Sequence, residues 1–400
     1  MKIGIIKEGK SPADSRVVLS PEQCKNLVSQ GYDINVQRSP VRCFPDDAYS
    51  KAGVPLVDSV ANCDVLLGVK EVPIEELIPN KTYFFFSHTI KAQSYNQKLL
   101  KACVDKNIRL IDYEALTNDD GQRVIAFGKF AGMVGAHNAL WTYGERLGNN
   151  PLPRMNSLTD YAVAKDIYNS IDLPNVKIAL TGTGRVSGGA AQVLEDMGIQ
   201  RVRPIDYVTK DYDKAVFTQL SSFYYAKRKD GKEFDSVQDF YNNPKDYDSD
   251  FHHFLPCSDI MINGIYWDND APAFFTAEQM ASPDYRIKVI ADVTCDIAPV
   301  SSIPSTLKAS TIADPVFGYD PQTKKEIAPY SEESIDMMTI DNLPNELPRD
   351  ASVAFGDMFI EHVLDELGKA NSVVLDRATI AREGDLGNHF EYLRGYLNGE

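Results

Sequence analysis

The segment VKIALTGTGRVSGGAAQVLEDMG, residues 176–198, gives the strongest indication of the fold. An apolar run leads directly into Gly182, Thr183 and Gly184, and a helix-like series of small residues follows from Arg185. Glycines at such a turn let the backbone approach a bound group, and the free N–H groups at the start of a helix favour a negative charge. The segment therefore predicts a strand, a tight turn and a helix that bind a dinucleotide pyrophosphate.

The spacing of this segment departs from the G-x-G-x-x-G pattern, because Ser187 stands where the third glycine would be and Gly188 follows it. An ordinary strand-to-helix turn is the alternative interpretation. The next β-like run, RVRPID, residues 201–206, favours the dinucleotide, since it ends in Asp206, where an acid can hydrogen-bond the adenine ribose. Asp206 favours NAD, whereas the nearby arginines leave NADP open; these are Arg185, Arg201 and Arg203.

Short β-like runs alternate with amphipathic helical patterns on both sides of this segment, as in a mainly parallel α/β sheet. The first domain carries such runs at residues 2–8, 33–37, 64–70 and 82–88, and a capped helix at 20–31. We expect an α/β fold of two Rossmann-like domains, with mainly parallel sheets flanking a cleft.

The expected N-terminal catalytic domain comprises residues 1–140 and 345–400, and the expected dinucleotide-binding Rossmann domain comprises residues 141–344. A polar, proline-bearing stretch at 149–157 has the composition of a hinge. The tyrosine-rich, weakly periodic segment 208–258 is interpreted as an insertion in the second domain, and 351–367 as a long helix packed on the first.

Composition excludes several classes of protein. The net charge of −16, from 57 acids against 41 bases, repels nucleic acid and anionic membranes, so neither is an expected partner. The six cysteines form no C-x-x-C pair and no zinc-like spacing, so we expect reduced thiols and no metal. The apolar run at the N-terminus is too short for a signal peptide, and no segment is long enough to span a membrane, which predicts a cytoplasmic protein.

Four basic side chains of the first domain lie beside apolar runs: Arg16, Lys70, His88 and Arg123. Strand ends of an open α/β sheet are where ligands bind, so these positions could meet in one crevice, although each alone is more often a solvated terminus. Loss of solvation lowers the pKa of a lysine, which would make Lys70 a proton carrier near neutral pH.

Long motifs along the chain resemble the lysine-forming saccharopine dehydrogenases, and most closely the lysine–2-oxoglutarate reductase domain of the bifunctional aminoadipic semialdehyde synthases. The motifs are KTYFFFSHTIKAQ (81–93), RLIDYE (109–114), RVIAFGKFAGMVG (123–135), LTGTGRVSGGA (180–190), MINGIYWDNDAP (261–272) and TIDNLPNELPRDASVAFGDM (339–358). The family is also a relative of alanine dehydrogenase and transhydrogenase, with the same two-domain plan.

The resemblance implies that the ε-amine of lysine condenses with 2-oxoglutarate, and that the imine takes a hydride from NADH or NADPH to give saccharopine. Lys70 and His88 would be the acid–base pair. The implied substrate-binding residues are Arg16, Lys91, Gln93, Glu114, Phe127, Thr294, Cys295 and Asp296.

The implied cofactor-binding residues are Arg123, Gly182, Gly184, Arg185, Val186, Asp206, Tyr266, Val293, Ile340, Asp341, Asn342 and Leu343. The nearest relatives by motif use NADP, whereas Asp206 favours NAD, so both cofactors stay open. Two other functions also remain: an amino-acid dehydrogenase of the alanine dehydrogenase type, and a dinucleotide-sensing protein without catalysis.

Overall fold

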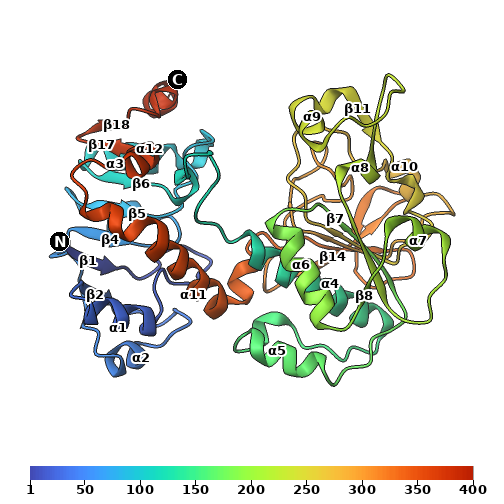
Figure 1. The fold of residues 1–400 in the computed structure, drawn as a ribbon, viewed down its shortest axis with the longest axis horizontal. Coiled ribbons are helices and arrows are strands. Elements are labelled where there is room, and N and C mark those ends of the chain that lie inside the picture. The colour runs from blue at the N-terminus through green and yellow to red at the C-terminus, as the bar shows by residue number, and fades with distance from the viewer. Residues whose placement is uncertain (400) are drawn as a thin grey trace. The chain divides into compact units, whose positions relative to one another are not determined.

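The computed structural model describes residues 1–399 and divides the chain into two units (Figure 1). Unit 1 comprises Met1–Phe127 and Pro348–Glu400, and unit 2 comprises Gly128–Leu347. The division falls at Phe127, earlier than the expected boundary near residue 140, because the long helix α4 (Gly128–Leu147) packs on α6 (Arg185–Asp196) of unit 2.

Unit 1 is built on one eight-stranded sheet with the order β18-β17-β6-β5-β4-β1-β2-β3. The six strands from β6 to β3 are parallel, and the two from the end of the chain are antiparallel. The strands are β1 (Lys2–Ile5), β2 (Asp33–Gln37), β3 (Leu56–Val57), β4 (Val65–Leu67), β5 (Thr82–Phe84), β6 (Arg109–Ile111), β17 (Thr379–Arg382) and β18 (Asp385–Leu386).

Helices of unit 1 cover both faces of this sheet. They are α1 (Pro21–Ser29), α2 (Asp46–Lys51), α3 (Gln97–Asp105), α11 (Pro348–Phe359), α12 (Val373–Ala378) and α13 (Arg394–Asn398). The predicted start of α1 is confirmed, since Ser20 and Gln23 form a reciprocal capping box. The predicted terminal helix is confirmed as α11, which continues as a π-helix, η8 (Ile360–Leu364).

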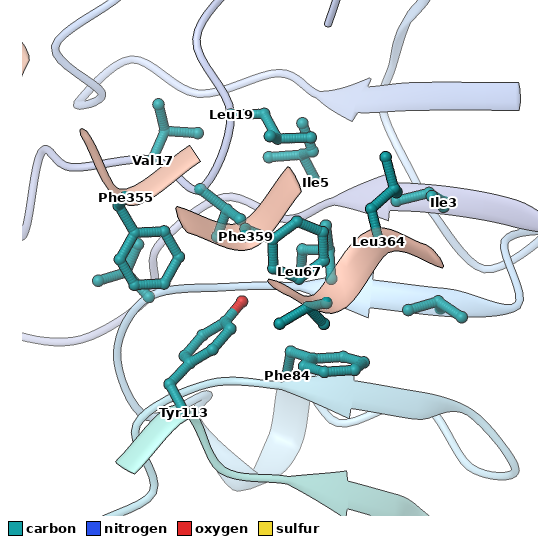
Figure 2. Close-up of a cluster of buried hydrophobic side chains, with 14 of the residues drawn as sticks. Ile3, Ile5, Val17, Leu19, Leu67, Phe84, Tyr113, Phe355, Phe359 and Leu364 are labelled. Atoms are coloured by element: carbon teal, nitrogen blue, oxygen red, sulfur yellow. The ribbon is translucent and has the colours of Figure 1, made fainter. Parts of the chain in front are cut away.

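The four consecutive aromatic residues 83–86 serve both faces of the sheet of unit 1. Phe84 and Phe86 belong to the core under α11, whereas Tyr83 and Phe85 belong to the core on the opposite face. Figure 2 shows Phe84 and Tyr113 with Phe355 and Phe359 of α11. Because successive side chains of an extended chain point to opposite faces, a sheet that is covered on both sides accepts an unbroken aromatic run.

Unit 2 has a second eight-stranded sheet, with the order β15-β14-β16-β13-β12-β7-β9-β8. The strands from β16 to β8 are parallel, and β14 and β15 are antiparallel. These strands are β7 (Lys177–Thr181), β8 (Gln200–Arg201), β9 (Val216–Leu220), β12 (Ile260–Asn263), β13 (Val289–Asp292), β14 (Val316–Asp320), β15 (Lys325–Ile327) and β16 (Ile335–Met338).

The helices of unit 2 besides α4 and α6 are short: α5 (Tyr161–Tyr168), α7 (Pro204–Thr209), α8 (Ser222–Tyr225), α9 (Val237–Asn242) and α10 (Ala277–Met280). The fold class predicted from the sequence is confirmed, since both sheets are mixed but mainly parallel.

Two predictions about unit 2 are wrong in detail. The run RVRPID is not a strand that ends in Asp206, because β8 ends at Arg201 and Asp206 lies in the first turn of α7. The expected insertion at 208–258 begins too early, because it includes β9, a strand of the main sheet that pairs with β7 and β8. Beyond β9 the segment forms α8, α9 and a two-stranded sheet of β10 (Ala226–Arg228) and β11 (Tyr247–Ser249).

Within residues 1–399, no helix combines the length and the apolar character needed to cross a membrane.

Candidate functional sites of the two units

Lys70 follows β4, and the side chain of Glu8 holds it through a hydrogen bond from its backbone N–H group. The carboxylate of Glu8, which follows the neighbouring strand β1, accepts the N–H groups of Val69 at 2.7 Å and Lys70 at 2.9 Å. Burial and the positive charge of Arg16 lower the pKa of Lys70 below its usual range. A lysine of this kind exchanges a proton more readily near neutral pH than an exposed one.

Glu8 itself titrates near neutrality. Burial raises the pKa of this carboxyl to about 7, and the two backbone N–H groups offset only part of that rise. A carboxyl and a lysine whose pKa values move toward each other are typical of sites that transfer protons.

His88 lies beyond the end of β5, in a left-handed backbone conformation with φ of 53°. Its Nδ1 is 2.6 Å from Glu71 Oε1, and the ammonium of Lys10 donates to Glu71 Oε2 at 2.7 Å. Burial alone would raise the pKa of Glu71, but the hydrogen bonds from His88 and Lys10 outweigh it and lower the pKa to about 2. Glu71 is therefore ionised and fixes the orientation of the imidazole, which also stacks on Phe86.

Arg16 is buried, with 2% of its surface exposed. Its Nε and Nη2 donate to the two carboxylate oxygens of Asp14 at 2.9 and 2.6 Å, and its guanidinium lies 4.3 Å from the centre of the Phe127 ring. The structure thus brings Arg16 and Phe127, two of the residues predicted for substrate binding, into contact, with Asp14 as an orienting partner that was not predicted.

The other predicted residues of unit 1 are more exposed. Arg123 forms an ion pair with Glu114 at 3.0 Å. Lys91 is exposed, and the side chain of Gln93 accepts a hydrogen bond from Tyr95 at 2.7 Å.

The glycine turn of unit 2 has the predicted form. Gly182 has φ of 92°, and a side chain there would lie 2.9 Å from the carbonyl oxygen of Gly264. Gly184 begins α6 without a side-chain cap, and a Cβ atom at Gly184 would meet open space. The first turn of α6 therefore has no side-chain cap at its N-cap residue, which is a feature of helix starts that bind anions.

Ser187 fills the position of the missing third glycine. Its hydroxyl lies 2.6 Å from the carbonyl oxygen of Thr181 and 3.0 Å from that of Gly264. The close helix contact that a glycine normally allows occurs at Gly189 instead, where a Cβ would lie 2.0 Å from the carbonyl oxygen of Lys129 in α4.

Asp206 does not lie at the end of a strand next to the glycine turn, because it belongs to α7. Its carboxylate is paired with Arg203 at 2.7 Å and with Lys210 at 3.0 Å, and hydrogen bonds from these two residues lower its pKa to about 2. β7 lies between β12 and β9 in the sheet, and on the β9 side the N–H group of Gly182 donates to the carbonyl of Leu220 at 2.7 Å. The chain that follows Leu220 is Ser221 and Ser222, which offer hydroxyls where a carboxylate was expected.

Buried polar groups join the ends of β7, β12 and β13. The side-chain amide of Asn263 accepts from Thr181 Oγ1 at 2.8 Å and donates to Asp292 at 2.9 Å. Asp292 also accepts from Thr294 Oγ1 and Thr306 Oγ1, both at 2.6 Å. Burial raises the pKa of Asp292, although these hydrogen bonds act against the rise.

The loop after β13 contacts the segment after β16. The thiol of Cys295, in a left-handed conformation with φ of 55°, lies 3.1 Å from the carbonyl oxygen of Thr339 and 3.5 Å from that of Ile340. Burial raises the pKa of this thiol, so it is not a reactive thiolate. The predicted residues Val293 to Asp296 and Ile340 to Leu343 therefore lie on adjacent loops of unit 2.

Tyr266 is 84% exposed and lines an aromatic pocket of about 370 Å³. The wall after β9 includes Tyr225, Phe240 and Tyr241, and the wall after β12 includes Tyr266 and Trp267. The insertion therefore supplies one side of a hollow that begins next to Gly264.

Besides Asp14, the polar residues Glu8, Glu71, Asn263 and Asp292 of these sites were not predicted. Glu71 is the neighbour of Lys70 in the sequence, and Asn263 and Asp292 end apolar runs, so a search for polar residues at strand ends would have found these three. Glu8 ends the predicted run 2–8, so the same search would have found it, although the sequence did not show that it contacts Lys70.

The fold and these groups define an α/β protein with a cluster of titratable side chains in one unit and a glycine-bearing strand–turn–helix in the other. Residues 4–134 match the family described as "Alanine dehydrogenase/PNT, N-terminal domain". Solved structures agree on the fold: an L-alanine dehydrogenase has a TM-score of 0.66 at 15% identity and covers 99% of this chain and 100% of its own. A transhydrogenase from Sinorhizobium meliloti has a TM-score of 0.58 at 15% identity, with coverages of 96% and 100%.

Curated relatives extend the similarity over nearly the whole chain. The "Alpha-aminoadipic semialdehyde synthase, mitochondrial" of Bos taurus is 30% identical over 437 residues, which cover 97% of this chain and 47% of that protein. The corresponding synthase of Arabidopsis thaliana is 29% identical and covers 98% and 41%. This chain thus spans about half the length of these synthases.

A shorter relative matches end to end. The NAD(+), L-lysine-forming saccharopine dehydrogenase of Emericella nidulans is 28% identical over 397 residues, with coverages of 94% and 95%. The resemblance drawn from the motifs is confirmed: the chain is a relative of saccharopine dehydrogenases and alpha-aminoadipic semialdehyde synthases, and homologous to NAD-dependent dehydrogenases that act on CH–NH groups.

Proposed function

We propose that the protein is a lysine-forming saccharopine dehydrogenase, that is, a lysine–2-oxoglutarate reductase. The observation that carries this proposal is the pair of Lys70 and His88 in unit 1, each held by an acid, beside the buried Arg16. The relative from Emericella nidulans, at 28% identity, carries the name of this reaction. The substrates would be lysine and 2-oxoglutarate in one direction and saccharopine in the other.

The reaction joins the ε-amine of lysine to the keto carbon of 2-oxoglutarate with loss of water, and the imine then accepts a hydride and a proton. Lys70, with its lowered pKa, would take the proton from the lysine ammonium and return one to the leaving hydroxyl. His88, oriented by the ionised Glu71, would exchange the proton at the bridging nitrogen. Arg16 would hold a substrate carboxylate, with Asp14 keeping its fork in place.

The cofactor, when bound, supplies or accepts the hydride. Support for its place in unit 2 comes from the open space at Gly184 and the uncapped start of α6. The polar network of Asn263 and Asp292 would fix the loops that carry Val293, Thr294 and Leu343. These residues would exclude water from the reacting carbon.

We further propose NADP(H) as the preferred cofactor. The chain after β9 carries Ser221 and Ser222 in place of an acid, and hydroxyls accommodate a 2'-phosphate without repulsion. Arg201 reaches the same place, because its guanidinium hydrogen-bonds Gln219, whose amide donates to the carbonyl of Gly182 at 3.0 Å.

The adenine ring would occupy the aromatic pocket. The order β9-β7-β12 puts the loops after β9 and β12 on either side of the glycine turn, and those two loops form the walls of the pocket. Stacking on Tyr266 or Trp267 would then bury a flat heteroaromatic ring.

The test of the reaction is the oxidation of NADPH or NADH by the purified protein. We expect turnover only when lysine and 2-oxoglutarate are both present. Turnover with pyruvate and ammonia but not with lysine would assign the protein to the alanine dehydrogenase type. Dinucleotide binding without turnover on any amine would favour a sensing protein.

The test of the cofactor assignment is binding, followed by Trp267 fluorescence in a Trp141→Phe background, because the chain has two tryptophans. We expect Arg201→Gln to weaken NADPH more than tenfold and NADH little. Asp206→Ala should leave both affinities unchanged. A selective loss of NADH affinity in the Asp206 variant would instead restore that acid as the ribose ligand.

A further inference from the structure

Two arginines of unit 1 lie opposite each other on the neighbouring strands β6 and β17. Leu110 of β6 is paired with Ala381 of the antiparallel strand β17, so Arg109 stands opposite Arg382. Like charges that lie directly opposite each other on neighbouring strands destabilise a sheet. The two arginines lie at the amino end of β6, whereas Lys70 and His88 follow the carboxyl ends of the parallel strands β4 and β5.

The acids nearby balance only one of these arginines. Arg382 donates to Asp376 at 2.7 Å, and His389 lies 3.5 Å from the other oxygen of that carboxylate. Among residues 1–399, the hydrogen bonds of the Arg109 side chain are two long contacts of 3.4 Å, from Nε and Nη2 to the hydroxyl of Thr379. Burial and the charge of Arg382 lower the pKa of Arg109, and the charge of Asp376, which Arg382 already binds, offsets only part of this effect.

A cavity of about 690 Å³ opens over this pair. Lys81 lines it, directly before Thr82, which is the residue paired with Arg109 on the other side of β6. The cavity also presents the amides of Asn107 and Asn371. Three cations therefore share the cavity with two carboxylates, Asp376, which is already bonded, and the exposed Glu383.

We propose that this cavity binds a small oxyanion with two negative charges, bridging Arg109 and Arg382 with Lys81 as a third contact. A planar guanidinium matches the oxygen pairs of carboxylates and phosphates, and an anion between the two arginines would remove their repulsion. Dicarboxylates and inorganic phosphate share this chemistry. The site is separate from the proposed acid–base cluster and does not depend on the proposed reaction.

The repulsion between Arg109 and Arg382 predicts that Arg109→Gln changes the melting temperature in opposite directions without and with a bound anion. Without an anion, Arg109→Gln should raise the melting temperature at low ionic strength, because it removes a like-charged neighbour. With the anion present, the same variant should lose the stabilisation that binding gives the wild type, since a ligand stabilises only a state that binds it.

The experiment measures thermal unfolding and isothermal titration of the full chain with inorganic phosphate and, separately, with succinate, at constant ionic strength. We expect at least one of the two to raise the melting temperature of the wild type and to bind more than tenfold more weakly to Arg109→Gln. A response to phosphate alone or to succinate alone identifies the source of the oxyanion.

Two control variants and one substitute variant make the result decisive. Lys101→Gln, an exposed α3 residue paired with Asp105 at 3.0 Å, should respond like the wild type. Arg16→Ala should keep the response, which separates this cavity from the proposed substrate site. If Arg109→Gln does not fold, Lys81→Gln replaces it, with the same loss of binding expected. No response to either anion in the wild type, or an unchanged response in these variants, would overturn the proposal.

Discussion

Lys70 and His88 are each controlled by an acid from a different part of the chain. Glu8 holds the backbone of Lys70, and Glu71 holds the ring of His88. The two acids have opposite properties, since the pKa of Glu8 is raised to about 7 and that of Glu71 is lowered to about 2. One acid is therefore free to exchange a proton near neutral pH, whereas the other keeps its charge.

Replacing Lys70 and His88 tests their assignment to different proton transfers. We expect Lys70→Met and His88→Gln each to lower turnover by roughly a hundred- to ten-thousand-fold, the usual range for a positioned acid or base. Each variant should flatten a different limb of the pH–rate profile. The measurement is steady-state oxidation of NADPH across pH.

The control for both variants is dinucleotide affinity, which should stay near that of the wild type, because the glycine turn belongs to unit 2. Wild-type turnover and two intact pH limbs in both variants would show that the acid–base pair is misassigned.

The packing of α4 on α6 depends on two glycines. A Cβ at Gly132 would lie 1.7 Å from the carbonyl oxygen of Val186, and one at Gly189 would lie 2.0 Å from that of Lys129. At Gly188, one residue away, a Cβ would have no neighbour within 4 Å. Of these two adjacent positions of α6, Gly188 has room for a Cβ atom and Gly189 has none.

Alanine at these glycines is expected to give opposite results. Gly132→Ala and Gly189→Ala should reduce the free energy of unfolding by at least about 1–3 kcal/mol, because rigid backbone must move to admit the methyl group. Gly188→Ala should raise it by roughly 0.5–1 kcal/mol, since alanine is the better helix former. Urea denaturation of the three variants measures both effects. Equal destabilisation by all three would contradict the close contact between α4 and α6.

The buried His137 of α4 predicts a loss of stability in acid. Burial lowers its pKa to about 4, and its ring lies 2.7 Å from the Tyr168 hydroxyl and 2.8 Å from the Pro153 carbonyl oxygen. The unfolded chain takes up this proton near pH 6.5 and the folded chain does so only near pH 4. The stabilisation is therefore complete above pH 6.5 and is lost as the pH falls toward 4, by about 3 kcal/mol.

His137→Gln should lose less stability than the wild type between these pH values, because glutamine does not titrate. Urea denaturation at a series of pH values measures the difference. His362→Gln, at a partly exposed position, serves as the control and should follow the wild type. Parallel curves for wild type and His137→Gln would contradict a neutral buried histidine.

At the scale of the whole molecule, the two units differ in how the sequence builds them. Unit 2 is one continuous segment with its own aromatic core. Unit 1 needs both ends of the chain, because β17 pairs with β6, and Phe355 and Phe359 of α11 pack on Tyr113 and Phe84 (Figure 2).

This difference predicts the behaviour of fragments. Residues 128–347 expressed alone should unfold cooperatively and bind NADPH, whereas residues 1–127 alone should not fold, since α11, α12 and β17, which contribute to the cores on both faces of their sheet, are missing. Circular dichroism during urea denaturation, with Trp267 fluorescence for binding, measures both outcomes. A stable, cooperative fragment 1–127 would show that α11 and β17 are dispensable.

The sequence by itself determined the α/β class, the strand–turn–helix at 176–198 and the cap of α1. It also showed that ionisable side chains, Lys70 and His88, end two apolar runs of the first domain. These features depend on periodicity and turn residues within a few positions, so they can be read locally. Only the tertiary structure decided which strand lies beside β7, and this removed Asp206 from the strand end and put Ser221 there. It also brought Glu8 to Lys70 and set Arg109 opposite Arg382. Such contacts join residues far apart in the chain, and the pairing of strands that creates them follows from packing of the whole sheet, which no local pattern encodes.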